Sequence, residues 1–550
     1  MPKNHLSIIE WAPRRSPLAL AVLATLLAQG SVHAAELSID NPDVAIRLDT
    51  TVRYNLGVRL QNVNPKWGNN SAFDESDYAF SKRGDVITNR VDLFSEFDLT
   101  FKKNYGLRVS AAVWGDAAYS DRGSQNPAFG SNTSYPNNEY TNYVKRFYSG
   151  PSGEFLDAFA YGKFDLGGAM TDVKVGRHAI LWGESLFGNT HGISNSQAPN
   201  DGRKGLSSPG ASAKETALPI GQISVQSQVT DTMLVGFQYL YEWRSNRLPE
   251  GGTLFGAADS VLDGPPRVSP TIGRGVPEEG GKGDFGVMVR MRPDWLNGTL
   301  GFYYRQYDEK NPWAAQLARN PTRTLPVYAK NLELYGVSIA KEVGGVSVGA
   351  EFSYRKNGAL SSAGAMGPRY EGAIGDTMHG LVNAIYFLPK LSWYDTANLS
   401  AELSWNHLAK VSQNAAVFKA AGYSAACTAA TDRIAAGCAS ENAYGLGLSF
   451  TPTWSQVQPG LDLSMPIFLN LGLSGNAASN SGGNQGFNTY KIGLSAIYRA
   501  VHQFDFAVMG WSVKSLPAAV NAGALPGAAN PNGAAYSDKA FAQFTYNYQF

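Results

Sequence analysis

The chain has 550 residues, 17% of them charged, and a formal net charge of +1. This balance, without a run rich in Lys and Arg, is not typical of proteins that bind nucleic acid. A soluble chain of this length usually divides into several domains, but no linker or change of composition divides this one. We therefore expect a single domain over residues 35–550, preceded by an export signal.

Residues 1–34 have the pattern of a secretory signal peptide. A basic pair precedes an apolar run from Leu18 to Leu27, and Val32 and Ala34 are small residues at the positions that specify cleavage. We expect cleavage after Ala34, which lowers the formal charge from +1 to −1. The alternative is an uncleaved anchor, but the apolar run is short for a membrane-spanning helix.

Residues 44–60 predict a long β-strand, because apolar and polar side chains alternate with period two rather than 3.6. The apolar face carries Ile46, Leu48, Val52, Tyr54, Leu56, Val58 and Leu60. The opposite face is polar and carries Arg47, Arg53 and Arg59. Such a strand is long for a soluble domain, and its two faces suit a wall between lipid and water.

The same alternation recurs along the chain. Residues 87–101 form the next predicted strand, and another begins at Leu107 after a short turn near Asn104. The further candidates are about 153–166, 171–182, 219–230, 232–245, 283–292, 298–309, 331–342, 345–356, 376–388, 396–408, 442–454, 459–473, 487–500, 502–513 and 538–550. The pattern is weakest in 153–166 and 459–473. The count is about eighteen strands, or sixteen if one hairpin is illusory.

The connections between these strands alternate in length. Long ones such as 117–152 alternate with short turns such as those near Gly167 and Gly344. Outer-membrane β-barrels have tight turns at one end and long external loops at the other. We therefore predict an all-β, transmembrane antiparallel β-barrel in the outer membrane of a Gram-negative bacterium, wide enough for an aqueous channel unless loops fill it. The alternative, an exported sandwich or propeller, fits the strand length and the mean hydropathy of −0.22 less well.

The sequence offers no catalytic motif. It has no HExxH, and no G-x-S-x-G elbow, P-loop or Rossmann fingerprint in a credible strand-to-helix setting. We expect neither an enzyme nor a bound cofactor or metal.

The polar faces of the first strands place charges of both signs in the predicted lumen. Candidate residues of a constriction there are Arg47, Arg53, Arg90, Asp92 and Glu96. Facing charges of opposite sign order water and polar solutes in a pore. The alternative, with equal weight, is that these residues only hydrate the lumen and pair with one another.

The connection 183–218 is a candidate constriction or plug. Long connections in compact proteins are usually functional or disordered. Further candidates for contact with a solute, in and just before this connection, are Arg177, Trp182, Glu184 and His191. Its apolar residues would help it to fold inward, although a mobile external loop is equally compatible with the sequence.

Two cysteines, Cys427 and Cys438, lie close together in one predicted loop. In an exported protein we expect them to form a disulfide, which stabilises a loop of this size by about 3 kcal/mol in the chain-entropy model. Two unpaired thiols are the alternative. A metal site is less favoured, because the segment has no histidine and no further cysteine.

The chain ends with FAQFTYNYQF, in which every second residue from Phe544 to Phe550 is aromatic. We predict that these aromatic residues face lipid and that the strand closes the barrel by pairing with residues 44–60. Phe550 is the candidate signal for the barrel-assembly machinery.

Several stretches together resemble one family. They are VRYNLGVRL, VGRHAILWGES, the loop with NDG and KETALP, and YLYEWRSNRLP. The chain is similar over nearly its whole mature length to the domain-of-unknown-function family thirteen-oh-two of Gram-negative outer-membrane proteins. The resemblance implies a barrel that moves hydrophobic small molecules, often beside a lipoprotein-like partner and sometimes an RND-type inner-membrane transporter.

We predict a passive channel for the uptake of hydrophobic or amphipathic small molecules of the alkane, sterol, terpene or fatty-acid class. Its surroundings are outer-membrane lipid and lipopolysaccharide. Aromatic residues of the loops, including Tyr140 and Trp313, are candidates for capturing the solute. The rival hypotheses are a general or polar-solute porin, an export conduit that works with an RND-type transporter, and a barrel enzyme, which would require a serine or carboxylate nucleophile.

Overall fold

The computed structural model describes residues 35–550 except 38–40, 70–73, 120–125, 127–133, 188–189, 209, 257, 260–262, 268–270, 314–316, 321–322, 365, 367–368 and 514–532. The predicted signal peptide lies outside the described residues.

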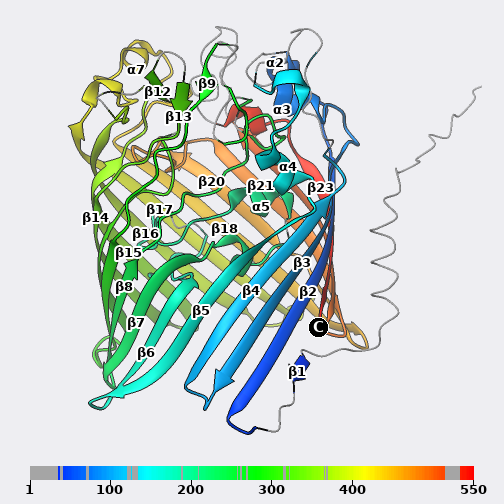
Figure 1. Ribbon diagram of the computed structural model, residues 1–550, viewed down its shortest axis with the longest axis vertical. Coiled ribbons are helices and arrows are strands. Elements are labelled where there is room, and N and C mark those ends of the chain that lie inside the picture. Colours follow the sequence, from blue (N-terminus) through cyan, green and yellow to red (C-terminus); the bar gives the residue numbers. More distant parts are fainter. Residues whose placement is uncertain are drawn as a thin grey trace, which may run out of the picture.

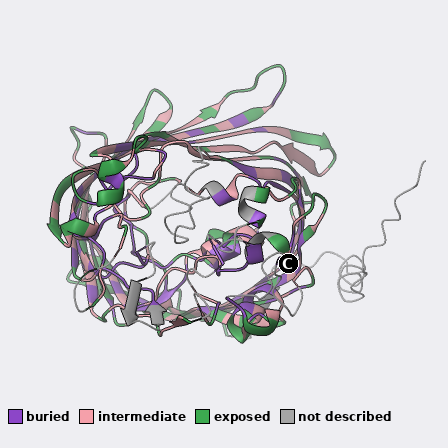
Figure 2. Ribbon diagram, turned by 90° about the horizontal axis from the view of Figure 1, so that it is seen from above, coloured by how far each residue is buried: buried purple, intermediate pink, exposed green. Residues whose placement is uncertain are grey.

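The chain forms a closed antiparallel barrel of 18 strands, as the alternating pattern predicted (Figures 1 and 2). Each strand pairs with its neighbours along the chain. The first half of the wall comprises β2 (Val44–Arg59), β3 (Val86–Phe101), β4 (Tyr105–Asp116), β5 (Ser152–Leu166), β6 (Ala169–His178), β7 (Ile220–Thr230), β8 (Met233–Leu240), β10 (Asp284–Met291) and β11 (Gly298–Tyr307). The second half comprises β14 (Leu332–Val343), β15 (Val346–Ala359), β16 (Ile374–Leu388), β17 (Thr396–Gln413), β18 (Asn442–Gln458), β19 (Leu461–Ser464) with β20 (Ile467–Ser474), β21 (Phe487–Tyr498), β22 (His502–Val513) and β23 (Phe541–Gln549).

The barrel closes where β23 pairs with β2, so the predicted closure of the last strand on the first is confirmed. At the end of this ladder Thr50 and Phe550 exchange two backbone hydrogen bonds of 2.7 and 2.9 Å. The short strand β1 (Ala35–Leu37) pairs with the part of β2 that lies beyond Phe550. The edge of β2 is therefore covered on both sides of that point.

The two faces of the wall differ as the period-two pattern requires. Val113, Phe302 and Tyr335 project outward and are 49%, 44% and 43% exposed. Arg53 and Asp92 lie opposite each other in the β2–β3 ladder, face the interior and are buried. An exposed apolar outer surface and a polar inner surface fit a barrel with lipid outside and polar contacts inside.

Several wall strands differ in length from the predicted ranges: for example, β8 ends at Leu240 rather than 245, and β17 continues to Gln413 rather than 408. Two further differences have a local physical cause. The strand predicted at 171–182 ends at His178, where the ring of His178 contacts Gly176 O and Ser224 Oγ and the chain turns inward. Gly176 has a φ of 128°, which favours glycine. The strand predicted at 459–473 is interrupted between β19 and β20, because Pro466 has no N–H to donate to the ladder.

The long connections gather at one end of the barrel and carry its short helices (Figure 1). These elements are α2 (Pro65–Gly68), α3 (Asp74–Tyr78), α4 (Asn142–Tyr148), α7 (Ala425–Ala429), the 3-10 turns η2 (Pro136–Asn138), η3 (Ala415–Val417) and η4 (Ala534–Tyr536), and the small sheet of β9 (Gly273–Arg274), β12 (Leu317–Asn320) and β13 (Arg323–Leu325). Within the described residues no helix is both long and apolar enough to cross a membrane.

Candidate functional site

Residues 179–219, here called the inward segment, leave the wall after β6 and return to it at β7. The segment contains α5 (Gly202–Ser207) and α6 (Ala213–Thr216), and α5 lies within the outline of the barrel in Figure 1. Trp182 anchors its beginning, because its ring packs near Tyr303 and its backbone N–H donates to Gln197 Oε1 at 2.7 Å. The segment therefore folds into the barrel interior rather than over its outside.

One end of the inward segment is bound to β2 and β3 by ion pairs between side chains. Arg53 Nη2 lies 2.5 Å from Glu215 Oε1, and Lys204 Nζ lies 3.0 Å from Glu215 Oε2. Lys214 Nζ lies 2.8 Å from Glu96 Oε2. Burial alone would raise the pKa of Glu215, but the hydrogen bond and charge of Arg53, together with Lys204, lower that pKa to about 2.

Asp92 and Arg90 extend this contact along β3. Ser208 Oγ donates to Asp92 Oδ2 at 2.9 Å, and Arg90 Nε lies 2.9 Å from Asp92 Oδ1. Arg90 Nη1 also donates to Phe147 O at 3.0 Å. Asp92 is thus shared between the wall and the segment, and Arg90 holds it in position.

The other end of the segment is bound to wall carboxylates on β15 and β17, across the barrel from β2. Glu351 accepts hydrogen bonds from the backbone N–H groups of Glu184, Ser185 and Ile193, the last two at 3.0 and 2.6 Å. Glu402 accepts in the same way from Leu186 and Phe187, at 2.6 and 3.4 Å. Two wall carboxylates therefore satisfy five backbone donors of the segment.

Wall guanidiniums bind the carbonyl groups of the same stretch. Arg355 donates to Thr190 O and Gly192 O at 2.8 and 2.9 Å. Arg305 donates to Ile193 O and Asn195 O at 2.8 and 2.7 Å. Hydrogen bonds that involve a charged group are the stronger kind, so this stretch is held on both its donor and its acceptor sides.

His191 and Glu184 add two side-chain contacts to this end. His191 Nε2 donates to Gly482 O at 2.8 Å, and its Nδ1 lies 3.0 Å from Nδ1 of His379 on β16. Because a carbonyl only accepts, the neutral ring carries its proton on Nε2. Burial and the charge of Arg355 lower the pKa of His191 to about 4. Glu184 Oε1 lies 3.0 Å from Arg290 Nη2.

The predicted site residues divide into two groups. Those on the inward segment or bonded to it are Arg53, Asp92, Glu96, Trp182, Glu184 and His191. Arg90 belongs with them through its pair with Asp92, although its own backbone partner is Phe147 O of α4. Arg47 lies apart, paired with Asp49 at 2.8 Å and largely exposed. Arg177 also lies apart, because its register places it on the outer face, where it pairs with Glu242 at 3.0 Å.

Several wall residues that bind the segment were not predicted, among them Arg305, Glu351, Arg355 and Glu402. The sequence signal was present but weak. Glu351 and Glu402 are isolated carboxylates at inward positions of strands that otherwise carry small or apolar residues, VSVGAEFSY and NLSAELSWN. Their partners are backbone groups, which have no signature in the sequence.

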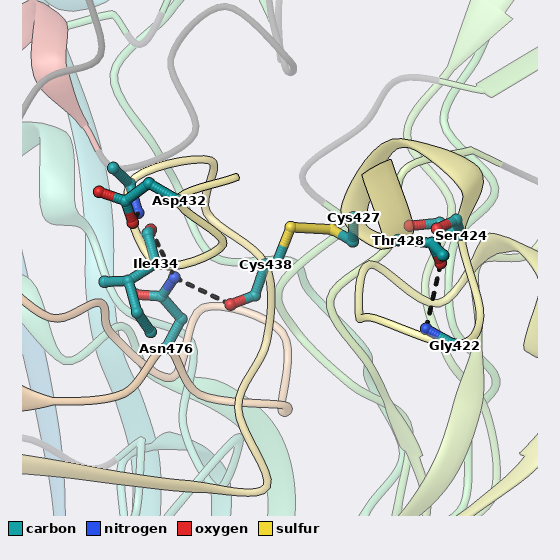
Figure 3. The surroundings of a disulfide bond; sticks show 9 residues. Gly422, Ser424, Cys427, Thr428, Asp432, Ile434, Cys438 and Asn476 are labelled. Atoms are coloured by element: carbon teal, nitrogen blue, oxygen red, sulfur yellow. Dashed lines mark hydrogen bonds between the residues drawn. A yellow bond between two sulfur atoms is a disulfide. The ribbon is translucent and has the colours of Figure 1, made fainter. Parts of the chain in front are cut away.

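The long connections contain buried aromatic residues and a disulfide. Tyr140 and Trp313 are 4% and 2% exposed, so they pack inside the loop cores rather than present a capturing surface. Cys427 and Cys438 are disulfide-bonded, and the Asn476 amide next to them donates to Ile434 O and Cys438 O (Figure 3). Within the described ranges no three His, Cys, Asp or Glu residues form a group that could hold a metal ion.

Comparisons with known proteins place the whole barrel in one family. The model of the family described as "Protein of unknown function (DUF1302)" matches residues 15–550. A search of curated proteins gave no significant match.

Several solved structures are similar in fold. OpdK of Pseudomonas aeruginosa, crystallised with vanillate, is 10% identical with a TM-score of 0.41, over 92% of this chain and 98% of that one. A BenF-like porin from Pseudomonas fluorescens Pf-5 is 10% identical with a TM-score of 0.42, over 92% and 98%. OccAB1 of Acinetobacter baumannii is 10% identical with a TM-score of 0.42, over 94% and 99%.

Proposed function

The chain belongs to the DUF1302 family of proteins of unknown function, and we propose that it is an outer-membrane channel for the uptake of hydrophobic or amphipathic small molecules. The long-loop end would face the outside of a Gram-negative cell and the short turns the periplasm, as in other barrels of this kind. The exposed apolar outer face of the wall supports the membrane location.

The observation that carries the proposal is the course of the inward segment. Residues 184–193 bind β15 and β17, while residues 204–216 bind β2 and β3 on the opposite side. A segment bound on both sides crosses the lumen and leaves only part of its cross-section for passage. This arrangement favours a selective conduit over a wide general pore.

The segment also presents apolar side chains inside the barrel. Leu181 and Leu186 are 50% and 37% exposed, although they belong to a segment that crosses a polar interior. Exposed apolar residues in a concave interior are typical of sites that bind an apolar ligand. They support a solute with an apolar body.

The proposal extends to partners. Lipopolysaccharide would surround the long-loop end, and the barrel-assembly machinery would recognise Phe550. A periplasmic lipoprotein-like protein and an RND-type transporter would act on the solute beyond the barrel. We propose no catalytic activity.

The test combines conductance with growth. The purified barrel is inserted into a planar bilayer, and a deletion strain is grown on alkanes, sterols, terpenes or fatty acids as sole carbon source. We expect low conductance and a growth defect that the wild-type gene restores. As a control, the gene that carries Arg47→Ala should restore growth as well as the wild-type gene does. Arg47 is exposed and pairs only with Asp49 among the described residues, so its loss should leave the channel intact.

Two outcomes would contradict the proposal. Large steady conductance with passage of hydrophilic sugars, and no growth phenotype, would identify a general porin. Internal accumulation of an apolar compound in the deletion strain, without a growth defect, would identify an export conduit.

A further inference from the structure

A cavity of about 190 Å³ lies between the tip of the inward segment and the wall. Phe187, Thr190 and His191 form one side, and residues of the connection between β20 and β21 form another. The wall side consists of inward positions on β17, β18 and β20: Glu402, Ser404, Gly445, Gly447, Asn470 and Gly472. Sites for drug-sized ligands are larger, roughly 300–1,000 Å³, so this cavity suits a small molecule or one end of a longer one.

Glycines make room for the cavity. A Cβ atom on Gly447 would lie 2.6 Å from the ring of Phe187, so the ring packs directly on the backbone of β18. A Cβ on Gly445 would meet Ser404 Oγ at 2.9 Å and, at an ordinary contact distance of 3.7 Å, Leu471 O. A larger side chain at position 445 would therefore fill the cavity. Phe187 also lies 5.4 Å from the ring of Phe468 and provides an aromatic wall.

The charges at the cavity have one sign. Glu402 is the single carboxylate of the lining, and among the lining residues there is no Lys or Arg. The carboxylate already accepts from Leu186 and Phe187. Burial lowers the pKa of His191 to about 4, so its ring is neutral at pH 7 and supplies no compensating charge. The nearby guanidinium of Arg355, whose charge acts on His191, is not among the lining residues and is already bonded to Thr190 O and Gly192 O. An anion entering here would therefore meet the Glu402 carboxylate directly, which is unfavourable.

The cavity also offers uncharged hydrogen-bonding groups. The side chain of Asn470 points into it and makes no hydrogen bond with any described residue, and Ser404 Oγ makes only a 3.4 Å contact with Gly445 O. An amide and a hydroxyl bind a neutral hydroxyl or carbonyl group well. The lining thus combines an aromatic face, the open backbone at Gly445 and neutral polar groups.

We propose that this cavity binds an uncharged small molecule with an apolar ring or chain and one hydroxyl or carbonyl group, and that it excludes carboxylate anions. The apolar part packs beside the Phe187 ring, over the backbone at Gly445, and the polar group bonds to Asn470 or Ser404. The proposal rests on the channel function above and narrows its solute class toward neutral alcohols and ketones and away from fatty-acid anions.

A matched pair of probes, benzyl alcohol and benzoate, tests the charge preference. The full mature barrel is placed in lipid nanodiscs with labelled alanine methyl groups, and the methyl of Ala443, which lines the cavity, is followed by NMR at pH 7. We expect a saturable shift with benzyl alcohol and at least tenfold weaker binding of benzoate. No saturable shift, or equal affinity for the two probes, would overturn the proposal.

Two variants and one control locate the binding. Gly445→Leu should abolish the shift, whereas Gly115→Leu, a wall glycine whose Cβ would have nothing within 4 Å, should leave it unchanged. Phe187→Ala should weaken benzyl alcohol binding several-fold, and it decides the question if Gly445→Leu does not fold. Unchanged affinity in Phe187→Ala would overturn the proposal. Because the titration reports binding directly, it gives its answer whether or not the growth test of the channel succeeds.

Discussion

The two ends of the inward segment are held by different chemistry. Residues 204–216 use their own charged side chains, as in the pairs Arg53–Glu215 and Lys214–Glu96. Residues 184–193 instead offer backbone N–H and C=O groups to wall side chains such as Glu351 and Arg355. For residues 204–216, both partners of each contact are charged residues that the sequence shows. For residues 184–193, only the wall partner is a charged residue, because the other partner is a backbone group.

This difference determines how each end is able to move. The ion pairs join single side chains, and replacing both members of a buried pair is often tolerated. The backbone contacts converge on few wall residues, so the loss of one wall carboxylate leaves several donors unsatisfied at once. We infer that 184–193 is the more cooperative end of the segment, and three measurements test this comparison.

The largest effect is expected for Glu351→Ala. The change removes the acceptor of three backbone N–H groups, and each hydrogen bond to a charged group contributes about 1.5–3 kcal/mol. Residues 184–193 should therefore undock, with much faster hydrogen exchange there and higher single-channel conductance, while 204–216 stays protected. Glu333→Ala is the control, because Glu333 contacts Tyr335 and Lys356 on the wall. Protection of 184–193 that survives Glu351→Ala would contradict the comparison.

A smaller effect is expected for Arg53→Ala. Removing one partner of a buried ion pair costs about 3–5 kcal/mol, and the remaining contact of Glu215 with Lys204 should keep the effect at the low end. Hydrogen exchange should increase at 204–216 and not at 184–193. The triple variant Arg53→Ala, Lys204→Ala, Glu215→Ala should be more protected than Arg53→Ala alone, because it removes all three buried charges of this group together. A triple variant less protected than Arg53→Ala would show that these ion pairs do not act in this way.

The smallest effect is a pH dependence of docking that is confined to residues 184–193. The folded pKa of His191 is lowered from 6.5 to about 4, so the docked state loses stability as the pH falls from 6.5 toward 4. The pKa of Glu215 is lowered from 4.5 to about 2, so its contribution is fully present above pH 4.5 and is lost below it. Between pH 6.5 and 5, exchange corrected for its intrinsic pH dependence should increase at 184–193 only.

His191→Gln is the control for the pH dependence expected between pH 6.5 and 5. Glutamine keeps an N–H donor for Gly482 O but does not titrate, so the pH dependence at 184–193 should become weaker. His379 and Arg355 remain beside the altered residue. A pH profile identical to that of the wild type would exclude His191 as the titrating group.

The barrel was predictable because its pattern is local. Alternation along each strand and the lengths of the connections gave the strand number and the closure of β23 on β2. The end of β6 was not predictable in the same way, since residues 179–182 continue the apolar pattern while the chain already turns inward at His178. Period-two alternation does not distinguish a strand that stays in the wall from an extended stretch that leaves it.

The site was predictable where its contacts join polar or charged side chains. Arg53, Asp92 and Glu96 were identified from the polar faces of their strands, and each contacts the inward segment. Glu351 and Glu402 were missed because their partners are backbone amides. Arg177 was grouped with the site by its neighbours in sequence, but the register of β6 turns it to the outer face.

The inward segment begins and ends on strands that are already paired. His178 and Ile220 face each other as Cα partners in the β6–β7 ladder. A two-residue turn between them would therefore replace residues 179–219 without changing the wall, since such turns join antiparallel neighbours directly. The product would be an engineered nanopore whose inner wall carries Arg53, Arg305, Glu351, Arg355 and Glu402 without their partners on the inward segment. Single substitutions among these five residues would then change the charge that a translocating analyte meets in the pore.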